Sequence, residues 1–138
     1  MVRQTVAITA YIPQRPPFVM VDELVSSSET SAVTTYCVPT DNVLLTGNEL
    51  PAAGLLENVA QTAAAWIGSI ATAKNEPVRI GYVGAVKKMN IYRLPQVGET
   101  LTTTIDVVAT AFDITLVSGT IKIGNELAAE MDLKIALQ

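Results

Sequence analysis

The order of hydrophobic and polar residues divides the chain into stretches typical of strands and one stretch typical of a helix. Apolar and polar side chains alternate most clearly near the C-terminus, which is the pattern of a half-buried strand. Gly124 and Asn125 suit a two-residue hairpin turn, while Gly81 and Gly84 interrupt an earlier strand. The pattern or composition of a strand is found at residues 18–25, 32–38, 79–92, 100–110, 112–123 and 127–137.

The segment at residues 55–73 is predicted to be a helix. It is rich in Ala and Leu, has no proline and carries one charged residue, Glu57. A helix that is apolar nearly all round is typically buried, and its polar residues favour a core helix over a membrane span. Pro51 suits a position near the first turn. The element order predicts an α+β fold in which an antiparallel sheet wraps around one long central helix.

Length and composition indicate one domain that has a partner. The 138 residues fit a single domain spanning 1–138. Hydrophobic residues make up 49% of the chain and charged residues 16%, so some apolar surface is expected to be hidden against another chain. We therefore expect a homodimer or a higher oligomer.

The charge of the chain argues against nucleic-acid partners. The formal net charge is -4, whereas nucleic-acid binding relies on a basic surface. Five of the nine basic residues nevertheless fall between positions 74 and 93, where they predict either a positive patch or separate, solvated charges. These five are Lys74, Arg79, Lys87, Lys88 and Arg93.

Several chemistries are excluded by residues that the sequence lacks. Histidine is absent, which removes histidine bases and histidine metal sites, and the single Cys37 cannot form a thiolate site. We expect no metal and no cofactor. Cys37 is expected to be a buried thiol, and the start of the chain does not resemble a signal peptide, so the cytoplasm is the expected location.

Glu57 is the leading candidate for chemistry, because burying an ionised carboxylate costs several kcal/mol unless it is paired. The macrodipole would favour its charge in the first helical turn. Gln61 lies four residues on, hence on the same face, and can orient the carboxylate. The backbone N–H groups of Gly54 and Leu55 are expected to be free to polarise a carbonyl. A half-exposed acid beside an ordinary helix entry is the alternative.

Three motifs resemble those of the 3-hydroxyacyl-acyl-carrier-protein dehydratases. The opening IPQRPPFVMVD at 12–22 is similar to the family's L-P-H-R-x-P-F-L-L-V-D, and GLLENVAQ at 54–61 is similar to its G-V-x-x-x-E-x-x-A-Q. Residues 84–90, followed by Arg93, Pro95 and Gly98, resemble the strand and turn that follow the helix in that family. The resemblance spans most of the chain and implies a hotdog fold.

The resemblance also implies a dehydratase site with one member missing. In that family a helix glutamate and a histidine from a G-H-F-P-G loop face each other across a dimer interface and remove water. Here the loop reads GNELPAAG, with Asn48 where the histidine would align, and Gln14 replaces the histidine of the opening motif. Glu57 and Gln61 match, but the base does not. The short loop is similar to a divergent branch associated with aryl-polyene synthesis.

Three functions remain open from the sequence. The first is dehydration of acyl-carrier-protein or coenzyme A thioesters in fatty-acid or polyene biosynthesis, with Glu57 as the acid and base. The second is a silent acyl-thioester or carrier-binding subunit that pairs with a histidine-bearing chain, and the third is a hotdog thioesterase. The basic cluster would receive the carrier or coenzyme A. Four small helix residues would either leave room for an acyl chain or permit close packing: Ala60, Ala63, Ala64 and Gly68.

Overall fold

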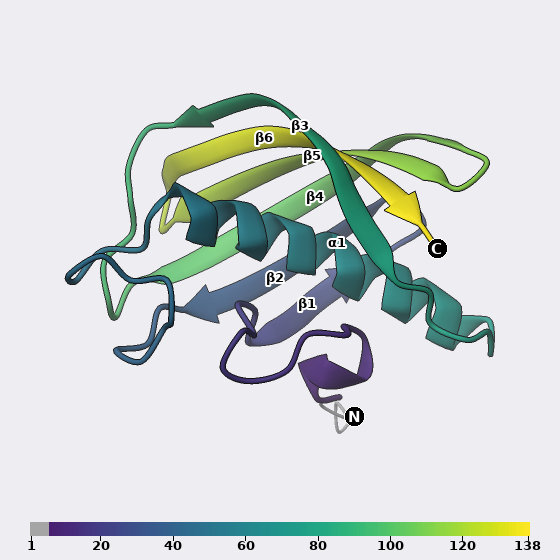
Figure 1. Cartoon of the computed structure of the whole chain (residues 1–138), viewed down its shortest axis with the longest axis horizontal. Helices are drawn as coiled ribbons and strands as arrows, with labels where there is room; N and C mark the ends of the chain where they lie inside the picture. The colour runs from purple at the N-terminus through teal and green to yellow at the C-terminus, as the bar shows by residue number, and fades with distance from the viewer. Residues whose placement is uncertain (1–5) are drawn as a thin grey trace.

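In the computed structural model, which describes residues 6–138, six strands join one antiparallel sheet and a long helix lies across one face of it (Figure 1). The sheet order is β1-β2-β4-β5-β6-β3, so β1 and β3 form its edges. In chain order the elements are a 3-10 turn η1 (Ile8–Ala10), β1 (Glu23–Ser27), β2 (Ser31–Cys37), α1 (Ala52–Ala73), β3 (Gly81–Ile91), β4 (Thr100–Ala111), β5 (Ile114–Ile123) and β6 (Glu126–Leu137).

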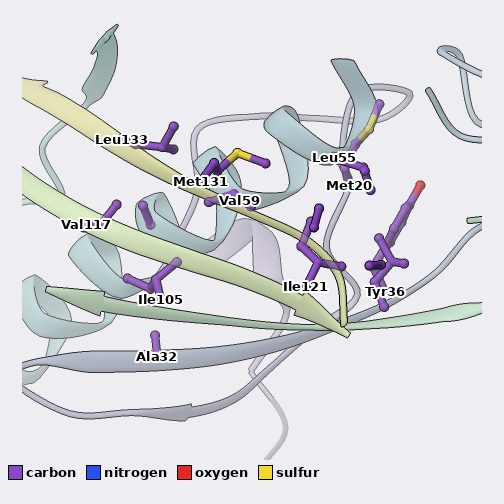
Figure 2. Close-up of a cluster of buried hydrophobic side chains, with 14 of the residues drawn as sticks. Met20, Ala32, Tyr36, Leu55, Val59, Ile105, Val117, Ile121, Met131 and Leu133 are labelled. Atoms are coloured by element: carbon purple, nitrogen blue, oxygen red, sulfur yellow. The ribbon is translucent and has the colours of Figure 1, made fainter. Parts of the chain in front are cut away.

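The core fills the space between the sheet and α1. Figure 2 shows Ile105, Ile121 and Met131 on the helix side of the strands, together with Val59 of α1. At Gly119 of β5 a Cβ atom would lie 2.6 Å from Val59 Cγ1, so the missing side chain allows the helix to approach the sheet. The predicted sheet wrapped around one central helix is confirmed.

The alternation near the C-terminus correctly predicted which side of β6 is buried. Met131, Leu133 and Ile135 are buried against the helix, whereas Lys134 is exposed on the opposite face. The same rule places Cys37 on the outer face of β2, because Tyr36 before it points into the core. The thiol of Cys37 is therefore exposed, and the expectation that it is buried was wrong.

The first predicted strand begins later than expected. The backbone around Met20 is held by helix side chains and not by a strand neighbour: its N–H donates to Gln61 Oε1 at 2.6 Å, and its carbonyl accepts from Asn58 Nδ2 at 2.8 Å. The carbonyl of Phe18 likewise accepts from Gln61 Nε2 at 2.8 Å. These bonds satisfy backbone groups that a strand would have paired, and β1 starts only at Glu23.

The edge strand β3 pairs with β6 and is irregular at two places. The register shifts between Val83 and Ala85, where Gly84 falls, and again between Lys87 and Asn90. An extra residue at such a bulge increases the twist of the strand. The interruption predicted at Gly84 is confirmed, and the bulged strand passes close to the outer side of α1 (Figure 1).

The helix begins at Ala52, with Pro51 as its N-cap, and is buried on one side only. Glu57 therefore lies in the second turn, and the expectation that it lies in the first turn was wrong. The side opposite the sheet carries Ala60, Ala64 and Ile67, which are half-buried. Among residues 6–138 no helix is long and apolar enough to cross a membrane.

Candidate functional site

Glu57 is held by a glutamine that is itself fixed. Gln61 Nε2 donates to Glu57 Oε1 at 2.8 Å, as the four-residue spacing predicted. Gln61 is fully buried, and its other bonds tie it to Met20 and Phe18 in the segment before β1. Because a buried amide with several partners has little freedom to rotate, Gln61 positions the carboxylate relative to the opening segment.

The carboxylate itself is half-exposed, so the expectation of a buried charge was wrong. The reason is that the sheet covers the opposite side of α1, where Asn58 and Val59 are fully buried. The alternative, an acid at the edge of the domain, describes Glu57 better. Its position is nonetheless not an ordinary surface position, because it forms part of the wall of a cavity.

The cavity has a volume of about 180 Å³ and lies between α1, β3 and the opening segment. Ala60 and Ala64 line it beside Glu57, so two of the predicted small residues do leave room. The other two serve packing: Ala63 is fully buried, and a Cβ at position 68 would lie 2.1 Å from the backbone oxygen of Tyr11. The complete lining is Gln14, Glu57, Ala60, Ala64, Ile67, Gly81, Tyr82, Val83 and Ile135.

Gln14 shares this cavity with Glu57 although the two are distant in sequence. Its Oε1 atom is buried. Among the side-chain nitrogen and oxygen atoms of residues 6–138, it is the one that is buried and has no hydrogen-bond partner. An amide oxygen accepts hydrogen bonds and cannot donate them, and the same is true of an ionised carboxylate. The lining of the cavity therefore includes a carboxylate and an amide side chain whose oxygen has no hydrogen-bond partner within residues 6–138.

Two other predicted groups are not brought to the cavity. Asn48 is exposed in the loop before α1, and its carbonyl accepts from Val97 N–H at 2.9 Å. The N–H groups of Gly54 and Leu55 both donate to the carbonyl of Pro51, at 2.9 and 3.3 Å. The expectation that these N–H groups are free was wrong, because the helix starts before Gly54 and uses both of them in its first turn.

The predicted basic cluster does not form one patch. Arg79 precedes β3 and Arg93 follows it, and an eleven-residue strand of about 36 Å separates them. Arg79 pairs with Asp113 at 3.0 Å, and Arg93 pairs with Glu99 and Glu126.

The other three residues of the predicted cluster are not held in ion pairs among the described residues. Within the part of the chain that the structure describes, Lys74, Lys87 and Lys88 form no ion pair. Lys74 caps the C-terminus of α1, whereas Lys87 and Lys88 lie together in β3. In the β3–β6 register Lys87 lies opposite Asp132, and the exposed Lys134 of β6 adds a further positive charge beside the same edge strand.

Sequence reasoning missed the wall of the cavity that β3 and β6 provide. Gly81, Tyr82 and Val83 come from β3, and Ile135 comes from β6. A Cβ at position 81 would lie 2.9 Å from Ile135 Cγ2, so this glycine permits a close approach. The glycine within a strand pattern was the available signal, since such glycines often mark a close approach of another group.

Comparisons with known proteins give one family and one fold. The family model of the ApeP-like proteins, described as ApeP dehydratase, matches residues 6–137. A structure of the dehydratase heterocomplex ApeI:P from Xenorhabdus doucetiae superposes with a TM-score of 0.92 at 16% identity, covering 98% of this chain and 93% of that chain. No curated protein sequence matches the chain.

More distant structures share the hotdog architecture. The PaaI protein from the phenylacetic acid degradation operon of E. coli has a TM-score of 0.66 at 18% identity, covering 82% of this chain and 80% of that chain. A hypothetical thioesterase with coenzyme A from Streptococcus pneumoniae TIGR4 has a TM-score of 0.67 at 12% identity and covers 84% of each chain. The predicted hotdog fold is confirmed.

Proposed function

Because the chain belongs to the ApeP-like dehydratase family, as its motifs predicted, we propose that it removes water from a 3-hydroxyacyl thioester, with Glu57 as the acid and base. One observation carries this proposal. A carboxylate held by the buried Gln61 shares a cavity with Gln14, whose side-chain oxygen has no hydrogen-bond partner among the described residues. Glu57 Oε1 already accepts from Gln61, so a 3-hydroxyl group would supply a donor to the other oxygen of Glu57 or to Gln14 Oε1.

The proposed chemistry is an elimination. The Glu57 carboxylate takes the proton from the carbon next to the thioester carbonyl, and the electrons of that C–H bond form the new double bond as the C–O bond to the hydroxyl breaks. The proton then passes from Glu57 to the departing oxygen, so that water leaves and the carboxylate is restored. A hydroxyl that donates to Gln14 Oε1 would be held beside the carboxylate for this transfer.

The test is mass spectrometry of the purified protein with 3-hydroxyacyl thioesters of coenzyme A and of an acyl carrier protein. We expect a product that is lighter by one water, and we expect Glu57→Gln to abolish it while the protein stays folded. Glu29→Gln, which alters an exposed acid in the β1–β2 turn, is the matched control and should keep full activity. Turnover that survives Glu57→Gln would overturn the proposal, and release of a free acid would identify a thioesterase.

A second candidate is a subunit that binds the acyl thioester while a histidine-bearing partner chain carries out the reaction. It is favoured by the absence of histidine from the sequence and by the likeness to a structure that is itself a dehydratase heterocomplex. A missing general base typically costs about 10²- to 10⁴-fold in rate, so a chain acting alone would be slow. A partner's base would remove that loss.

We propose that the second chain, whether identical or related, docks along β3. This strand is a sheet edge, and edges with free backbone groups readily pair with another strand. Apolar side chains are exposed on and beside it, including Tyr82 at 56% and Tyr92 at 59%. The cavity of about 180 Å³ is also smaller than the ~300 Å³ at which ligand pockets usually begin, so a second wall would enlarge it.

The two candidates are separated by the same assay run on the mixed complex. If the chain is a binding subunit, it will be inactive alone and the complex with a histidine-bearing hotdog chain will keep its activity after Glu57→Gln in this chain. If Glu57 is the acid and base, that substitution will abolish the activity that depends on this chain. Size-exclusion chromatography with light scattering identifies which assembly each sample contains.

A further inference from the structure

A second cavity lies next to the first, toward the C-terminal end of α1. Its volume is about 250 Å³, and Ile67 belongs to the walls of both cavities. The helix contributes Trp66 and Ile70 to the second cavity, and the turn between β4 and β5 contributes Phe112. Most of the lining residues are apolar, although Glu76 and Arg79 also belong to it. Nothing in the proposed elimination uses these side chains.

The two cavities follow one face of the helix in succession. Glu57, Ala60, Ala64 and Ile67 are spaced by three or four residues, so they lie in one row along α1. Ile135 lines the first cavity, and Leu137, two residues further on the same strand, lines the second. A ligand that enters beside Glu57 and runs along this row reaches Ile67 before it can reach the second cavity.

The partition between the cavities consists of side chains that converge over Gly81. A Cβ at position 81 would lie 3.4 Å from Ile67 Cδ1 and 3.4 Å from Leu137 Cδ2, in addition to its contact with Ile135. The Cδ1 end of Ile67 thus approaches the strand on the opposite wall. Ile67 is half-buried, packs against the core and lines both cavities, so its side chain lies between the two spaces.

We propose that the second cavity is the subsite for the distal end of an acyl chain, and that Ile67 sets the chain length that the protein accepts. This inference rests on the proposed function only in taking an acyl thioester as the ligand. Neither cavity alone reaches the ~300 Å³ of common ligand pockets, whereas the two joined exceed it. Phe112 supports an apolar occupant, because its side chain is fully exposed at the rim of the second cavity.

The experiment is calorimetric titration with S-alkyl coenzyme A thioethers of increasing chain length, which cannot be turned over. For the wild-type protein we expect affinity to rise about fourfold for each methylene that enters the first cavity, and to level off when the chain reaches Ile67. In Ile67→Ala the rise should continue through further methylenes. Ile70→Ala is the matched control, since it removes the same atoms from the second cavity only and should level off at the wild-type length.

The proposal would be overturned if affinity levelled off at the same chain length in the wild-type protein and in Ile67→Ala. It would also be overturned if the affinity of the wild-type protein never levelled off. If Ile67→Ala fails to fold, Ile67→Val should give a smaller extension, and Ile67→Phe should shorten the accepted chain. The titration measures binding and not turnover. A shift in levelling length in a protein that shows no Glu57-dependent elimination would therefore reject the proposed reaction and leave the chain-length role of Ile67 standing.

Discussion

Gln61 and Glu57 are joined across one turn of α1 by a 2.8 Å hydrogen bond in which a fully buried amide donates to a half-exposed carboxylate. The same amide binds the backbone of Phe18 and Met20. The side chain that orients the candidate catalytic group therefore also anchors the opening segment, which carries Gln14 to the cavity. Gln61 therefore contributes both to the orientation of Glu57 and to the stability of the fold.

Replacing Gln61 by leucine is expected to destabilise the protein, because Met20 N–H loses its acceptor in a buried place. An unsatisfied buried group costs about 1–3 kcal/mol, and the carbonyl of Phe18 loses a donor as well. Urea denaturation measures the loss. Glu57→Gln should change the unfolding free energy by less than about 0.5 kcal/mol, since Glu57 is half-exposed. Equal stability of Gln61→Leu and the wild-type protein would contradict this account.

The hydroxyl groups of Thr34 and Thr62 are fully buried and lie 2.7 Å apart between β2 and α1. Thr62 donates to the carbonyl of Asn58, so Thr34 must donate to Thr62. Thr62→Val should cost about 1–3 kcal/mol because it leaves the Thr34 hydroxyl without an acceptor. Adding Thr34→Val should recover most of that loss, and a double-mutant cycle by urea denaturation tests the coupling. Purely additive losses would argue against it.

Gly68→Ala is expected to destabilise the protein even though alanine normally favours a helix by about 1 kcal/mol over glycine. A Cβ at this position would lie 2.1 Å from the backbone oxygen of Tyr11, and backbone cannot yield as a flexible side chain does. Gly84→Ala is a control, because its Cβ would meet the nearest atom, the oxygen of Lys134, at 3.7 Å. Thermal unfolding should show a lower Tm for Gly68→Ala and a small change for Gly84→Ala.

The pKa of Glu99 is lowered, first by a hydrogen bond from the backbone N–H of Gln96 and then by the Arg93 guanidinium. A carboxyl group with a lowered folded-state pKa stabilises the fold above its unfolded pKa of about 4.3, and that stabilisation is lost as the pH falls through the folded value. Glu99→Gln should therefore lower Tm at neutral pH, and the difference from the wild-type protein should vanish in acid. A difference in Tm between Glu99→Gln and the wild-type protein that grows as the pH falls would contradict the lowered pKa of Glu99.

Lys87 and Lys88 are expected to bind the acidic surface of a carrier protein, because they form no ion pair within residues 6–138. Reversing both charges to glutamate should weaken carrier binding by roughly tenfold at low ionic strength and by less at high salt. Titration at two salt concentrations measures this, with Lys122→Glu on β5 as the control. Unchanged affinity and an unchanged salt dependence in the double variant would exclude this docking site.

Much of the fold was determined by local patterns in the sequence. The alternation in β6 specifies its buried face, because successive strand residues point to opposite sides. The four-residue spacing of Glu57 and Gln61 is enough to place them together on a helix. The motifs around them also sufficed to identify the family. Each of these conclusions depends on neighbours within a few residues, which a sequence displays directly.

Only the tertiary structure decided how the site is enclosed. The exposure of Glu57 depends on which side of α1 the sheet covers. The position of Gln14 depends on the hydrogen bonds that Gln61 and Asn58 form with the backbone of Met20. The partition at Ile67 likewise exists because β3 and β6 bring Gly81 and Leu137 to the helix. Such contacts join residues that lie far apart in the chain, and no local period encodes them.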